Sequence, residues 1–428
     1  MFVGAVGATR EPSLRLMTVT GNVLKESVFM ARFLPDGTVY RRQELLGLLL
    51  VLLWLAGCAT LGSPPTPDAT SPDEAFQRGV TALTNNAYDQ AITHFTDALQ
   101  LAPNRVEAYQ NRGEAYRRKG DYDRALADYT QALAINPNHA PSFYNRGIVH
   151  SNKQAYDEAI ADYTRALTIN QQFTEAYVNR GIAYDRGKRD YDRAIADYNQ
   201  ALILDPNRAD AYMNRGIAYK NKRDHDRAIT NYTQAIALNP SYAAAYVNRG
   251  VVYDEKGDLD RAIADYDQAL TLQSNFPEAY VNRGAAYHRK GAYDRAIADF
   301  TQALTLNASL APAYYNRGTA YQRKGDVNRA ITDFSQAVSL NPRYTAAYVD
   351  RGSAYSEQGE HDRALADFNQ ALSINPNYGL AYYHRSVTWF YKKDYTKAWV
   401  DVKRFQQTGG KPDPQFMRDL RRASGRQR

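Results

Sequence analysis

The sequence has little of what an enzyme or a disulfide-stabilised domain requires. Its one cysteine, Cys58, excludes an internal disulfide. Its seven histidines are scattered, without the spacing that metal ligands show. No acidic run has the glycine and terminal glutamate of a calcium loop, and no glycine-rich loop is available to bind a phosphate. We therefore expect no enzyme, with no catalytic residues, no metal, no cofactor and no small-molecule substrate.

Long apolar runs are also missing. The main one, Leu45 to Leu55, has about eleven residues, whereas a membrane-spanning helix needs roughly 20. Arg41 and Arg42 precede it, and the small residues Ala56 and Gly57 follow. This order is typical of a secretory signal peptide. The alternative is a buried apolar helix beside an incidental cysteine.

An excess of charge of one sign is absent from most of the chain. The net charge is +7, of which residues 1–57 contribute +2 and residues 403–428 contribute +6, which leaves −1 for the rest. A near-neutral body argues against nucleic acid as a partner, because such a surface needs a basic stripe. The basic tail is either a solvated end or a contact for an anionic lipid or polymer; it contains Arg418, Arg421, Arg422, Arg426 and Arg428.

The sequence consists mainly of one 34-residue unit repeated ten times. The units begin at Pro72, Val106, Ala140, Thr174, Ala209, Ala243, Pro277, Ala311, Thr345 and Gly379. A fixed period of this length predicts a stack of helical hairpins in which each repeat contacts its neighbours. Positions are counted below from the first residue of each unit.

Each unit predicts two helices joined by a tight turn. In the unit at Val106, positions 4, 8 and 11 share one helical face, as do Ala125, Tyr129 and Ala132 at positions 20, 24 and 27. Gly113 at position 8 allows the two helices to approach closely. Gly120 ends the first helix and Asp121 caps the second. The second helix ends at Asn136, because a residue before proline avoids helical geometry.

This pattern closely resembles the tetratricopeptide repeat, over about 80% of the chain. The resemblance implies an all-α fold, a right-handed superhelical solenoid of about ten hairpins whose first helices line the concave face. We expect a bulge at Arg186–Asp190, where one unit has an extra residue, and softer helix ends where Gln171, Ser274 and Ala308 replace the last proline. A capping helix should start at Pro414 behind Asp413 and run to about residue 423.

The segment that ends in Leu55-Ala56-Gly57-Cys58 resembles the lipobox of bacterial lipoproteins. The resemblance implies that Cys58 is lipidated and becomes the mature amino terminus, and that the protein is anchored in the bacterial cell envelope. Ala59, where aspartate would favour the inner membrane, favours the outer membrane or its periplasmic face. The predicted organisation is a leader at 1–57 (with Met30 an alternative start), a flexible tether at 58–71, the repeat array at 72–408, and the capping helix and basic tail at 409–428.

Position 6 carries more asparagine than folding requires, since asparagine is a mediocre helix former. The amides are Asn111, Asn145, Asn179, Asn214, Asn248, Asn282 and Asn316, followed by Asp350 and His384. Such a row can pair with the backbone of an extended peptide, because each amide both donates and accepts. It resembles the asparagine ladder in the tetratricopeptide arm of the O-linked sugar transferases. Aliphatic side chains at positions 5 and 9 are expected to flank it as an exposed strip, chiefly Val178, Ile182, Ile217, Val247 and Val281. The alternative is that recent duplication copied the asparagines without a use.

Two charged positions also recur. Position 7 is arginine from Arg112 to Arg385, and position 23 is usually aspartate, as in Asp128. We predict paired charges between helices, with a structural role.

These features favour a non-enzymatic, membrane-tethered scaffold that binds a partner protein or extended peptide in its concave groove. The alternative is an accessory subunit of a cell-envelope enzyme or export complex. Such a subunit would contact its partner by the convex face or the C-terminal end, through Trp389, Trp399 and Phe405.

Overall fold

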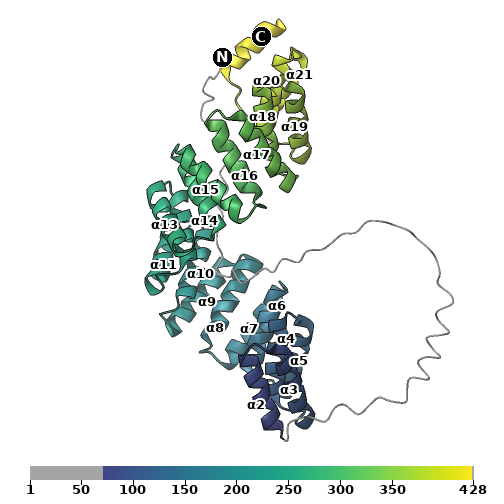
Figure 1. Ribbon diagram of the computed structural model, residues 1–428, viewed down its shortest axis with the longest axis vertical. Helices are drawn as coiled ribbons and strands as arrows, with labels where there is room; N and C mark the ends of the chain where they lie inside the picture. Colours follow the sequence, from purple (N-terminus) through teal and green to yellow (C-terminus); the bar gives the residue numbers. More distant parts are fainter. Residues whose placement is uncertain (1–70, 427–428) are drawn as a thin grey trace, which may run out of the picture. The chain divides into compact units, whose positions relative to one another are not determined.

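The chain folds into paired antiparallel helices, as seen in a computed structural model that describes residues 71–426 (Figure 1). The described residues contain no strand. They form two parts, 71–222 and 223–426. The first part contains α2 (Pro72–Thr84), α3 (Tyr88–Leu101), α4 (Val106–Lys119), α5 (Tyr122–Ile135), α6 (Ala140–Asn152), α7 (Tyr156–Ile169), α8 (Thr174–Ala183), the π-helical turn η1 (Tyr184–Lys188), α9 (Tyr191–Leu204) and α10 (Ala209–Asn221).

The second part begins with the second helix of a repeat and ends with a single helix. It contains α11 (His225–Leu238), α12 (Ala243–Glu255), α13 (Leu259–Leu272), α14 (Pro277–Arg289), α15 (Tyr293–Leu306), α16 (Ala311–Arg323), α17 (Val327–Leu340), α18 (Thr345–Glu357), α19 (His361–Ile374), α20 (Gly379–Tyr391), α21 (Tyr395–Gln407) and α22 (Pro414–Ser424). The predicted all-α solenoid of tetratricopeptide-type hairpins with a terminal capping helix is confirmed.

The hairpins before the last close around a glycine at position 8 and an aromatic ring at position 24, whereas the last has Ser386 and Val402 there. A Cβ atom on Gly113 would lie 2.9 Å from Cε1 of Tyr129, closer than side chains tolerate. Tyr129 and Ala125 are both fully buried. Only hydrogen at position 8 therefore lets the ring of position 24 fill the space between the helices, as the sequence predicted.

The turn inside the hairpin also follows the prediction. Gly120 has a φ of 82°, in the left-handed region that favours glycine. Oδ1 of Asp121 then accepts a hydrogen bond from the backbone N–H of Arg124 at 3.2 Å, which caps α5. The extra residue in the unit at Thr174 is absorbed by η1, so the predicted bulge is a π-helical turn.

At Gln171 and Ala308 the helix ends are not softer, so that expectation was wrong there. Before Ser274, α13 ends at Leu272 and is followed by Gln273. The helices α7 and α15 end at Ile169 and Leu306, which is the same repeat position as Ile135 in α5. The reason is the asparagine that follows each helix. Oδ1 of Asn170 accepts from the N–H of Gln172, and Oδ1 of Asn307 accepts from the N–H of Ser309, both at 3.0 Å. These local turns end the helix without proline.

Stacking of the hairpins sets which helices face inward. In each part, the first helix of a repeat contacts the first helix of the next, as α4 contacts α6 and α14 contacts α16. Within residues 71–426, no second helix has a comparable contact with the next second helix. First helices therefore lie closer together, and each part curves with its first helices on the inner side.

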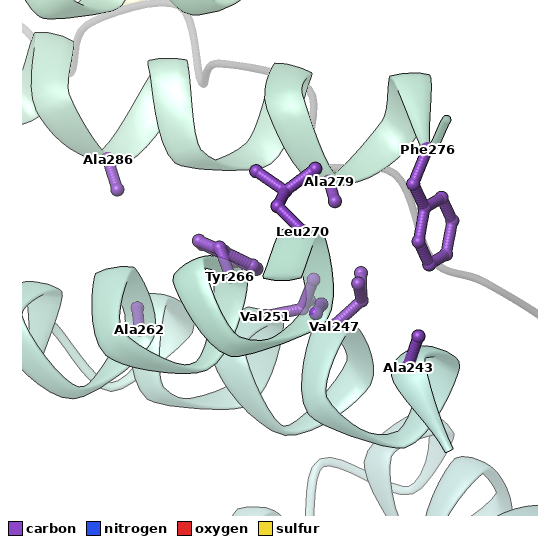
Figure 2. Packing of buried hydrophobic residues seen from close by; sticks show 10 residues of the cluster. Ala243, Val247, Val251, Ala262, Tyr266, Leu270, Phe276, Ala279 and Ala286 are labelled. Atoms are coloured by element: carbon purple, nitrogen blue, oxygen red, sulfur yellow. The ribbon is translucent and has the colours of Figure 1, made fainter. Parts of the chain in front are cut away.

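The core runs along the stack between the helices. Figure 2 shows it for the repeat that begins at Ala243, where side chains of α12, α13 and α14 meet around the buried Tyr266. At the C-terminal end, Leu420 of α22 is fully buried against Ala398 and Val402 of α21. The N–H of Phe416 donates to Oδ1 of Asp413 at 2.8 Å, as predicted for the start of this helix. Helix α22 thus covers the last apolar face of the stack, which terminal repeats of a solenoid require.

In the part of the chain that the structure describes, none of the helices combines the length and the apolar character needed to span a bilayer. The predicted leader, Cys58 and the tether lie outside the described residues, and their assignment stays a prediction.

Candidate partner-binding surface

The arginine at position 7 and the aspartate at position 23 form the predicted ion pair in eight of the ten hairpins; the exceptions have His94 and Asn231 at position 23. Nε and Nη2 of the arginine donate to the two carboxylate oxygens at 2.7–2.9 Å. The pairs are Arg112–Asp128, Arg146–Asp162, Arg180–Asp197, Arg249–Asp265, Arg283–Asp299, Arg317–Asp333, Arg351–Asp367 and Arg385–Asp401. This two-pronged geometry fixes the angle of the guanidinium as well as its position.

The same guanidinium also reaches the preceding repeat. Nη1 of Arg112 donates to Oγ1 of Thr96 at 3.0 Å, and Nη1 of Arg351 donates to Oγ of Ser335 at 3.1 Å. Each arginine therefore joins three helices: the two of its own hairpin and the second helix of the hairpin before it. We call this unit, an arginine with its aspartate and its hydroxyl partner, the arginine clamp.

Charge and burial act in opposite directions in the clamp. The hydrogen bond to Asp265 raises the pKa of Arg249. Burial raises the pKa of Asp265, although Arg249 opposes that effect. Such pairs add little net stability but define register strongly, because either partner alone would leave a buried charge. The clamp thereby holds the first helix, and the position-6 residue beside the arginine, in a fixed place on the inner side.

The position-6 amides of residues 71–222 remain accessible. Asn111, Asn145, Asn179 and Asn214 are half-buried. The side chains of Asn111, Asn145 and Asn214 have no hydrogen-bond partner in this part of the structure. Asn179 differs, because its Nδ2 donates to the hydroxyl of Tyr144 at 2.9 Å. Three amides, on the inner helices α4, α6 and α10, are thus available to another molecule, and the bonded amide of α8 lies between the last two.

Position 6 changes character in residues 223–426. Asn248, Asn282 and Asn316 are fully buried, and neither polar atom of the Asn316 amide has a partner. Asp350 accepts a hydrogen bond from the hydroxyl of Tyr315 at 2.7 Å, the same relation between repeats that Asn179 has with Tyr144. Burial raises the pKa of Asp350 to about 6 and lowers that of His384 to about 4. Amides that are both accessible and unpaired are therefore found in the first part rather than along the whole row.

The aliphatic residues at position 5 lie in the core instead of forming an exposed strip. Val178, Val247 and Val281 are at most 4% exposed. Each packs against the aromatic ring at position 24 of its own hairpin, as Val178 does with Tyr198. Position 5 faces the second helix because it is three residues before position 8, on the same helical face. At position 9, Ile182 stays half-buried and Ile217 is 9% exposed. No finding tests a role of these side chains in partner binding.

The aromatic residues of the last repeat hold the cap. Phe405 is 5% exposed, and its ring lies 5.0 Å from that of Tyr383. Trp389 and Trp399 pack around Leu420, and Nε1 of Trp399 donates to Oγ of Ser424 in α22 at 3.0 Å. These rings therefore serve internal packing.

Sequence reasoning missed two features. The first is the tyrosine at position 5, as in Tyr144 and Tyr315, whose hydroxyl forms a hydrogen bond with the position-6 side chain of the next repeat. The second is another row of ion pairs. The lysine at position 14 pairs with the aspartate at position 18 of the preceding repeat, as Lys153 does with Asp123 at 2.6 Å. The constant spacing of 30 residues was the signal that would have revealed this row. Among residues 71–426 there is no group of three or more side chains that could hold a metal ion.

Comparisons with known proteins agree with this geometry. Family models described as the tetratricopeptide repeat match 106–139, 140–173, 209–242, 277–310, 231–264 and 315–398. A model described as the TPR repeat matches 188–222 and 252–291. A search of curated proteins finds no significant match.

Several solved structures resemble the chain. A tetratricopeptide repeat protein from Parabacteroides merdae is 22% identical, with a TM-score of 0.48, over 59% of this chain and 99% of that one. YrrB, described as a TPR protein with an unusual peptide-binding site, is 24% identical, with a TM-score of 0.39, over 46% and 97%. Yeast Tom70 is 15% identical, with a TM-score of 0.40, over 83% and 95%. Because the family models together match more than half of its residues, the chain belongs to the tetratricopeptide repeat family.

Proposed function

We propose that this protein is a non-enzymatic scaffold that binds an extended segment of a partner protein along the inner helices of residues 71–222. The observation that carries the proposal is the set of three half-buried, unpaired amides, Asn111, Asn145 and Asn214. Each can donate one hydrogen bond to a peptide carbonyl and accept one from a peptide N–H. Recognition would use the backbone of the partner, so it would tolerate many side-chain sequences.

The energies require that several amides act together. One hydrogen bond contributes about 1 kcal/mol net. Three amides with two bonds each would contribute about 6 kcal/mol before the entropy of ordering the peptide is subtracted. The arginine clamps of Arg112 and Arg146 favour such binding, because they hold α4 and α6 in place before the partner arrives and so reduce that entropic cost.

A matched pair of variants tests the proposal. The inner variant replaces Asn111, Asn145 and Asn214 with alanine together. The control replaces three exposed asparagines in the turns between repeats, which are Asn104, Asn138 and Asn207. Binding of the full chain to an array of unstructured peptides of varied sequence is then measured, with circular dichroism as the check on folding.

The inner variant should lose peptide binding while the control keeps it. Equal binding by the inner variant and the unchanged protein, with both folded, would show that the amides are relics of duplication. Strong preference for one peptide sequence would refute recognition through the backbone.

We also propose that Cys58 carries a lipid and anchors the scaffold in the bacterial cell envelope, with the outer membrane favoured. The support is the apolar run that ends in Ala56-Gly57-Cys58 and the following Pro- and Ser-rich tether. Mass spectrometry of the mature amino terminus tests this directly. An acylated cysteine at residue 58 is the expected result, and an unprocessed leader or an unmodified Cys58 would contradict it.

A further inference from the structure

The basic side chains near the C-terminus differ from those of the repeats. In the array, position-7 arginines and most position-14 lysines form ion pairs, such as Arg351–Asp367 and Lys392–Asp362. Between residues 403 and 426, the structure shows seven exposed basic side chains, and none forms an ion pair with a described residue. They are Lys403, Arg404, Lys411, Arg418, Arg421, Arg422 and Arg426. Residues 403–426 contain two carboxylates, Asp413, which caps α22, and Asp419, which accepts from Gln415, so the cap presents a net excess of positive charge.

Helix α22 directs part of this charge outward. Its inner face is set by Leu420, which is fully buried, and by Phe416 and Met417, which pack beside it. Arg418, Arg421 and Arg422 are exposed and share the other face, because residues three and four apart are neighbours on a helix. The apolar packing of the inner face thus fixes three arginines on one outer surface.

A hollow adjoins the C-terminal end of this helix. Its volume is about 500 Å³, and it is lined by Lys392, Lys393, Asp394, Tyr395, Thr396, Trp399, Ser424 and Arg426. The one carboxylate, that of Asp394, is paired with Lys397 at 2.9 Å. The guanidinium of Arg426 lies 5.3 Å from the centroid of the Trp399 ring. Lys393 is exposed and also has no acidic partner in the described chain. Two unpaired cations beside an indole ring suit an anionic headgroup, because tryptophan prefers the boundary between lipid and water.

We propose that the outer face of α22 and the adjoining hollow form a docking surface for an anionic lipid bilayer. The outer face of α22 is the exposed side of a helix, and it carries positive charge without forming a channel. Mobile anionic lipid headgroups can gather against such a surface. A nucleic-acid strand would instead need a basic track that continues along the protein, and the repeats that α22 covers are near neutral. This proposal does not depend on the lipid at Cys58, since it concerns the opposite end of the chain.

Vesicle binding tests the surface separately from the proposed anchor. The full chain carries Cys58→Ser throughout, so that no acyl chain contributes. Co-sedimentation is measured with vesicles that contain phosphatidylglycerol and with pure phosphatidylcholine vesicles. The test variant is Arg418→Gln, Arg421→Gln, Arg422→Gln. The matched control is Arg193→Gln, Arg261→Gln, Arg329→Gln, which changes three arginines that are 63–66% exposed elsewhere.

The unchanged chain should bind the anionic vesicles and not the neutral ones. The test variant should bind about 100-fold more weakly, at roughly fivefold per charge, and the control variant should bind normally. A version with lysine at residues 418, 421 and 422 should also bind, because charge rather than arginine geometry is required. Tryptophan fluorescence reports whether α22 stays packed on Trp389 and Trp399 in every variant.

Three results would overturn the proposal. One is the absence of binding to anionic vesicles by the unchanged chain. Another is equal weakening by the test and control variants. The third is a chain that does not bind vesicles but binds a single-stranded RNA homopolymer, with that binding lost in the test variant.

Discussion

The arginine clamp predicts a strong energetic coupling that a double-mutant cycle can measure. In the clamp of Arg351, the guanidinium donates to both oxygens of Asp367 at 2.7 and 2.8 Å and to Ser335 at 3.1 Å. The side chains of Arg351 and Asp367 are 17% and 9% exposed. Their hydrogen bond raises the pKa of Arg351, so the guanidinium stays charged near neutral pH.

The magnitude follows from what each change leaves behind. Asp367→Leu leaves a guanidinium with only Ser335 as a partner, and Arg351→Met leaves a buried carboxylate. Removing one partner of a buried pair costs about 3–5 kcal/mol of folding stability. Because Arg351 is partly exposed, the cost of Asp367→Leu should lie near ~3 kcal/mol. The double variant removes both charges and replaces them with apolar groups, so it should cost about 1–2 kcal/mol relative to the unchanged chain. The coupling energy is the sum of the two single costs minus the cost of the double variant, and it should therefore be about 4–7 kcal/mol.

The assay must respect the repeat architecture, because long arrays do not always unfold in one step. Hydrogen exchange of α18 and α19 gives the local opening free energy for each of the four proteins. Exchange of α3 in the same molecules serves as an internal control, since it should not change. A coupling energy below about 0.5 kcal/mol would refute the view that the clamp is an interdependent unit.

Three further predictions concern single residues. Burial raises the pKa of Asp350 to about 6, so the folded chain holds this proton more tightly than the unfolded chain, and stability falls as pH rises from about 4 to about 6. Asp350→Asn should thus be more stable than the unchanged chain by about 3 kcal/mol at pH 8 and equal to it at pH 4 in urea unfolding; a pH-independent difference would contradict this. Gly352→Ala should destabilise by about 1–3 kcal/mol, because its Cβ would lie 2.8 Å from Cε1 of Phe368, and an unchanged midpoint would show that the ring can move away. Gln154→Gly should stabilise by about 0.5–1 kcal/mol, since Gln154 has a φ of 60°, and a loss of stability would mean that its side chain contributes contacts.

Local features of the fold could be predicted from residue spacing alone. The 34-residue period indicated ten hairpins, and Gly113, Gly120 and Asp121 indicated the close contact, the turn and the cap. These predictions succeeded because each depends on residues inside one repeat, at most a turn or two away. The expected softness at Gln171 failed for a related reason, because the weight given to proline hid the local turn that Asn170 makes.

The candidate site depended on relations between repeats, which only the tertiary structure decided. The amide row was visible in the sequence, yet the amide of Asn179 bonds to Tyr144, a residue of the preceding repeat, whereas Asn145 remains unpaired. Likewise, the period could not tell that Val178 packs against Tyr198 instead of facing a partner. Repeat spacing determines which residues share a helix face. What those faces meet is set by the curvature and contact between neighbouring hairpins, and this differs from one repeat to the next.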